Sequence, residues 1–134
     1  MRNYTAIVLS EDVQDSLVKV AKPLIPKEWS SRDLGRFGHH ATLSYDSNPI
    51  ILGLQHGEVK IIKLMGLARN ARTCAFIGYD EDFTKMIHIS MGTKFLVSPL
   101  ECNILTEKDI IMPYFRTVAG RISEGYDEFW NLRK

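Results

Sequence analysis

The chain contains two similar stretches, His40-Ala41-Thr42-Leu43 and His88-Ile89-Ser90-Met91. Each has a histidine, a hydroxyl residue two positions later and then an apolar residue. Residues two apart on a β-strand share a face, and adjacent residues point to opposite faces. Each stretch therefore predicts a strand whose histidine and hydroxyl side chains project together, while the alternating apolar residues enter the core. The chain has four histidines, so the spacing alone is a weak motif. The matching strand-like context of the two stretches strengthens it.

Two such pairs on one surface favour phosphodiester chemistry. The imidazole pKa lies near neutrality, so one histidine can act as a general base while the other acts as a general acid. Hydroxyl groups can donate hydrogen bonds to the non-bridging phosphate oxygens, where charge accumulates. The predicted catalytic residues are therefore His40, Thr42, His88 and Ser90. The scheme requires neither a metal nor another cofactor, and the residues do not decide which histidine is the acid.

Two other interpretations fit the same residues. The histidines can be structural residues at strand edges, with Thr42 and Ser90 chosen for their β propensity. A zinc site formed by two histidines and a cysteine is a third interpretation, but Cys74 and Cys102 lack the usual ligand spacing. We expect these cysteines to be reduced and buried.

The segments around the motifs predict a mixed α+β fold. Residues 4–9 form an apolar strand, Ser10 is a candidate N-cap for an amphipathic helix, and Pro23 should end that helix near Lys22. Gly120 marks a bulge or a close backbone approach within a last strand. Further strands are expected at residues 39–45, 58–68, 73–79, 86–91 and 114–122, and a short helix can open at residues 106–109.

Bulk composition limits the range of functions. The 134 residues suit one domain, assigned to residues 1–134, and the 45% hydrophobic and 25% charged shares are typical of a globular protein. The net charge of +1 argues against a large nucleic-acid footprint, which requires a clear basic excess, but allows a small nucleotide or an RNA end. With neither a signal segment nor a long apolar run, the chain is expected to be cytoplasmic, without a membrane partner.

Substrate-binding candidates come from residues close to the motifs. Arg36 and Lys94 flank them as possible phosphate contacts, and Tyr4 and Phe37 offer aromatic rings for stacking on a base. His39 should point away from His40 if the strand is regular. His56, in a glycine-containing loop, is expected to be exposed, and the oligomeric state is left open.

The two motifs resemble those of the two-histidine (2H) phosphoesterase superfamily, also called RNA-ligase-T-like or cyclic-phosphodiesterase-like. The resemblance implies a two-lobed, pseudo-symmetric α+β fold in which antiparallel sheets with flanking helices surround a central cleft. The opening strand and helix, the element Glu101-Cys102-Asn103 and the ending Val118-Ala119-Gly120-Arg121 are similar to family features. The interval between the motifs is short, which implies a reduced second lobe and a compact phage or viral type.

That resemblance implies hydrolysis of cyclic nucleotides or cyclic oligonucleotides, possible messengers of antiviral defence. If the chain is viral, its location would be the host cytoplasm. Opening of 2′,3′-cyclic phosphates on RNA ends during RNA repair is an alternative within the family. An alternative of another class is a nucleotide-binding module without catalysis.

Overall fold

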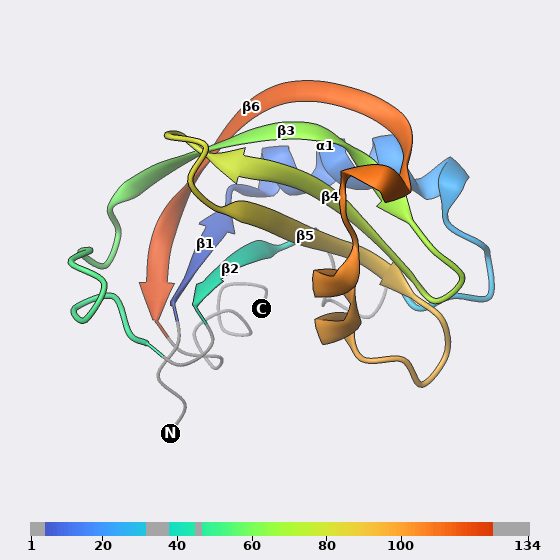
Figure 1. The fold of residues 1–134 in the computed structure, drawn as a ribbon, viewed down its shortest axis with the longest axis horizontal. Helices are drawn as coiled ribbons and strands as arrows, with labels where there is room; N and C mark the ends of the chain where they lie inside the picture. Colours follow the sequence, from blue (N-terminus) through green and yellow to red (C-terminus); the bar gives the residue numbers. More distant parts are fainter. Residues whose placement is uncertain (1–4, 32–37, 45–46, 125–134) are drawn as a thin grey trace.

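The computed structural model describes residues 5–31, 38–44 and 47–124 of the chain. Within these residues, antiparallel strands close into a barrel with the order β1-β2-β5-β4-β3-β6 (Figure 1). The strands are β1 (Thr5–Leu9), β2 (His40–Ser44), β3 (Val59–Arg69), β4 (Thr73–Asp80), β5 (Met86–Thr93) and β6 (Ile110–Glu124). The helices are α1 (Glu11–Ala21) and the short 3₁₀ segments η1 (Lys22–Leu24), η3 (Pro99–Ile104) and η4 (Glu107–Asp109).

The opening strand and helix agree with the sequence prediction. Ser10 caps α1 by accepting a hydrogen bond from the backbone N–H of Val13 at 3.4 Å. The helix ends at Ala21, one residue before the predicted end, and Pro23 lies in the following 3₁₀ turn. Leu17 and Ala21 are fully buried, so α1 covers part of the barrel core with its apolar face.

Closure of the barrel depends on two long strands, β3 and β6, which arch over the top of the view in Figure 1. They pair along most of their length, with register shifts between Leu64 and Gly66 and between Leu67 and Ala68. Such bulges bend and twist a strand, which allows a sheet to curve back on itself. Because β6 also pairs with β1, the sheet has no open side among the described strands.

β6 begins at Ile110, four residues before the predicted start, and so contains Pro113. A proline removes one ladder hydrogen bond and is therefore tolerated where a strand has only one neighbour. Pro113 pairs with Gly66 of β3, whereas β1 pairs only with the Gly120–Glu124 end of β6. The first half of β6 thus has the character of an edge strand.

One row of side chains across the sheet forms the centre of the core. Cross-strand pairing aligns five residues that are each no more than 1% exposed: Ile122, Ile7, Ala41, Ile89 and Phe76. The predicted close approach at Gly120 is confirmed, because a Cβ there would lie 2.5 Å from Ile7 Cγ2 and 2.6 Å from the Val8 oxygen. The fold is thus mostly antiparallel sheet with few helices, which agrees with the predicted combination of antiparallel strands and helices.

Candidate active site

The pairing of β2 with β5 brings the two histidine motifs together. Ala41 pairs with Ile89 in antiparallel register, so His40 lies opposite Ser90 and Thr42 lies opposite His88. Diagonal neighbours on an antiparallel pair are separated by about 7–8 Å, which is the relation between His40 and His88. This spacing suits two side chains that approach a single small group from opposite sides.

All four motif side chains lie on the outer face of the barrel. Ala41 and Ile89, which separate them along the strands, are fully buried in the core. His40, Thr42, His88 and Ser90 are half-buried, as expected for the opposite face of the same strands. This pattern agrees with the prediction that the histidine and the hydroxyl residue of each motif project from the same face of their strand.

His40 has an unusual electrostatic environment. Burial lowers the pKa of its imidazole to about 3, and the neighbouring His39 lowers it in the same direction. The residue as a whole is half-buried. The ring is therefore neutral at physiological pH, so one of its nitrogens donates a hydrogen bond and the other accepts one.

The prediction that His39 points away from His40 is wrong. His39 lies at a bend just before β2 begins, so strand alternation does not govern it. It is 3% exposed, and its Nδ1 atom lies 3.3 Å from Nδ1 of His40 with the two rings nearly perpendicular. One of the two nitrogens must carry the hydrogen, so the tautomers of the two rings are coupled.

His88 and Ser90 contact a segment that crosses the outer face of the sheet, residues 99–109, here called the strap. His88 Nε2 lies 2.8 Å from the Leu105 carbonyl oxygen, which can only accept a hydrogen bond. Nε2 therefore carries a hydrogen, and Nδ1 is the nitrogen that can take up or release a proton. The Ser90 hydroxyl donates to the Pro99 carbonyl at 3.4 Å.

The strap is anchored by buried side chains and by an ion pair near its start. Cys102 and Leu105 are no more than 1% exposed and pack on the outer face of β3 and β4. Arg72, in the turn between these strands, forms a bidentate pair with Glu101. Both cysteines are free and buried as predicted, and burial raises the pKa of Cys74 to about 12.

Of the four predicted substrate-binding residues, Lys94 lies within the described part of the chain. Tyr4, Arg36 and Phe37 lie outside the described residues. Lys94 is exposed beyond the end of β5, where its backbone N–H donates to the Arg72 carbonyl in the turn between β3 and β4. It thus lies beside the turn between β3 and β4, four residues past Ser90 in the chain.

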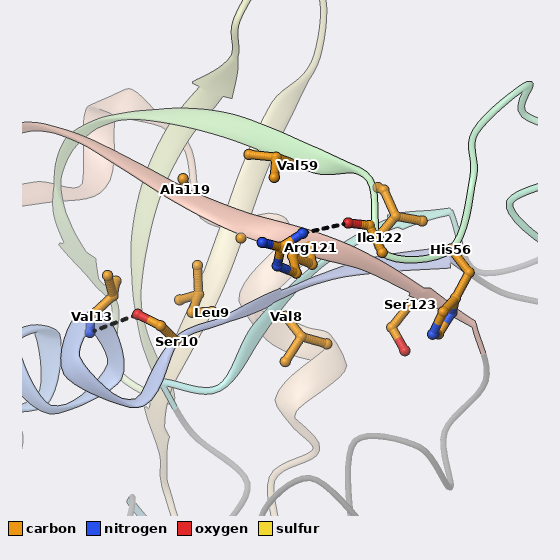
Figure 2. A pocket seen from close by; sticks show the side chains of 12 residues that line it. Val8, Leu9, Ser10, Val13, His56, Val59, Ala119, Arg121, Ile122 and Ser123 are labelled. Carbon is orange, nitrogen blue, oxygen red and sulfur yellow. Dashed lines mark hydrogen bonds between the residues drawn. The ribbon is translucent and has the colours of Figure 1, made fainter.

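A surface hollow that the sequence did not predict lies beside the first motif. It has a volume of about 720 Å³, and its lining includes Val8, Val59 and Arg121, with the predicted exposed His56 at one end (Figure 2). Val8 is the cross-strand neighbour of His40, so the hollow adjoins the histidine face. Strand alternation around Gly120 could have indicated that Arg121 points outward.

Comparisons with family models, with curated proteins and with solved structures find no match for the chain. Among residues 5–31, 38–44 and 47–124, no three His, Cys, Asp or Glu side chains gather as a potential metal site. Within the same residues, no helix has the length and apolar character needed to cross a membrane.

Proposed function

We propose that the chain is a metal-independent phosphodiesterase of the 2H type that hydrolyses cyclic nucleotides or cyclic oligonucleotides. His40 and His88 would transfer protons, and Thr42 and Ser90 would bind the non-bridging phosphate oxygens. Opening of 2′,3′-cyclic phosphates at RNA ends would use the same groups. We infer a cytoplasmic location, that of the host if the chain is viral.

The observation that supports this proposal most strongly is the register of Ala41 with Ile89. It gives the two motifs one common face, with each histidine opposite the hydroxyl residue of the other motif. A phosphate between the imidazoles would then meet a hydroxyl beside each of them. General acid–base catalysis requires this kind of convergence, because both proton transfers must reach the same reacting group.

We assign His40 as the general base and His88 as the general acid. In hydrolysis, the neutral His40 takes a proton from water as its oxygen attacks phosphorus, and protonated His88 gives a proton to the leaving oxygen as its bond to phosphorus breaks. A group with a pKa of about 3 is a weak base. A bound phosphate anion would raise the pKa of His40, because a nearby negative charge favours the protonated imidazole.

We further propose that the barrel is a fused form of the two-lobed family fold. Its strand order can be divided into β2-β1-β6 and β5-β4-β3, with one histidine strand at the end of each half. A single residue pair joins these two strands, whereas β3 and β6 are extensively paired. Between β2 and β5, the described residues contain no α-helix, in keeping with a reduced second half.

The test is a product assay in EDTA with 2′,3′-cyclic AMP, cyclic dinucleotides and cyclic trinucleotides. We expect His40→Ala and His88→Ala to lower turnover of the active compound by roughly 10²–10⁴-fold each. Lys19→Ala is the control, since it removes an exposed side chain of α1 that does not line the hollow beside the histidine face. Full activity in both motif variants, with folding verified by circular dichroism, would refute the assignment.

A nucleotide-binding module without catalysis is the second candidate. The low pKa of His40 and the strap contacts of His88 and Ser90 favour it, because these groups then already have structural partners. The two candidates differ in outcome: a module binds a nucleotide in calorimetry while the wild-type chain forms no product. Product formation that depends on both histidines would exclude it.

A further inference from the structure

Arg121 lies in the middle of the surface hollow beside the histidine face. Its cross-strand partners are Val8 on β1 and Val59 on β3, and Figure 2 shows both near it in the lining. One guanidinium nitrogen donates to the Gly57 carbonyl at 2.9 Å. Within the described part of the chain, Arg121 forms no ion pair with a carboxylate. It therefore offers a positive charge and further N–H donors to a ligand.

The position of Arg121 relative to the motifs follows from the strand registers. Arg121 pairs with Val8, and Val8 pairs with His40, so all three residues lie in one outward-facing row. Two steps between neighbouring strands separate Arg121 from His40 by about 10 Å. A ligand that contacts both residues therefore extends along this row, and a second phosphate would complement the positive charge of Arg121.

We infer that the hollow is a subsite for a second phosphate, and that the preferred substrate is an oligonucleotide, linear or cyclic, with at least two phosphates. This inference rests on the proposed function of the histidine face. The scissile phosphate lies between His40 and His88, and the next phosphate pairs with Arg121. The intervening nucleoside lies over Val8, whose apolar side chain suits a sugar or base. The volume of about 720 Å³ is within the usual range of small-ligand sites.

The experiment measures binding by calorimetry in a His88→Ala background, so that turnover does not interfere. The probes are 5′-phosphorylated diadenylate, with two phosphates, and unphosphorylated diadenylate, with one. We expect Arg121→Gln to weaken binding of the two-phosphate probe about tenfold, since a charge-assisted contact is lost, and to leave the one-phosphate probe unchanged. The salt dependence of binding reports how many ions are released, and for the two-phosphate probe this number should fall by about one in Arg121→Gln.

Lys19→Gln is the matched control, because it removes the same charge from the exposed side of α1. Equal effects of Arg121→Gln on the two probes, no effect on either, or no binding of the two-phosphate probe would overturn the subsite. Absence of turnover in the wild-type chain would refute the phosphodiesterase proposal instead. If Arg121→Gln then weakened binding of the two-phosphate probe alone, the subsite would still be supported.

Discussion

The desolvated ring of His40 makes the stability of the fold depend on pH in a defined window. Its pKa is 6.5 when exposed and about 3 in the folded chain. Between these values the unfolded chain binds more protons at this position, so the free energy of unfolding falls as pH falls through the window. From pH 8 to pH 5 this linkage amounts to about 2 kcal/mol for one group. Above pH 6.5 the contribution of His40 is fully retained.

Urea unfolding at pH 8 and pH 5 measures this quantity when wild type is compared with His40→Asn. The variant cannot titrate at position 40. The decrease in its free energy of unfolding from pH 8 to pH 5 should therefore be smaller than that of wild type by about 2 kcal/mol. Lys19→Gln, on the exposed side of α1, is the control and should behave like wild type. An identical acid-induced loss in His40→Asn and wild type would show that burial does not hold the His40 ring neutral.

Four more substitutions probe the packing and the chemistry. Gly120→Ala should destabilise the fold by about 1–3 kcal/mol in urea unfolding, because its Cβ would lie 2.6 Å from a backbone oxygen; a neutral result would contradict this approach. Thr42→Val and Ser90→Ala should each lower turnover roughly ten- to a hundredfold in steady-state assays, and undiminished rates would remove the hydroxyls from the mechanism. Leu105→Ala should destabilise by about 2–5 kcal/mol and change the tautomer of His88 seen in ¹⁵N NMR spectra; an unchanged tautomer would mean that the strap does not fix it.

Local patterns predicted most elements of the fold. The Ser10 cap, the end of α1 near Pro23 and the short helical turn after Thr106 depend on neighbouring residues, so the sequence reveals them directly. The early start of β6 was not predicted, because the tolerance of Pro113 depends on which strands lie beside it. The neutral state of His40 likewise depends on burial and on the ring of His39, which no spacing rule describes.

By itself, the sequence determined which side chains of β2 and β5 share a face, because alternation along a strand is a property of the backbone. It thereby separated His40, Thr42, His88 and Ser90 from the buried Ala41 and Ile89 before any fold was known. Only the tertiary structure decided that the two strands are neighbours, that the sheet closes between β3 and β6, and that Arg121 lies in the same row as His40. Strand pairing joins residues far apart in the chain, and its register depends on packing of the whole barrel.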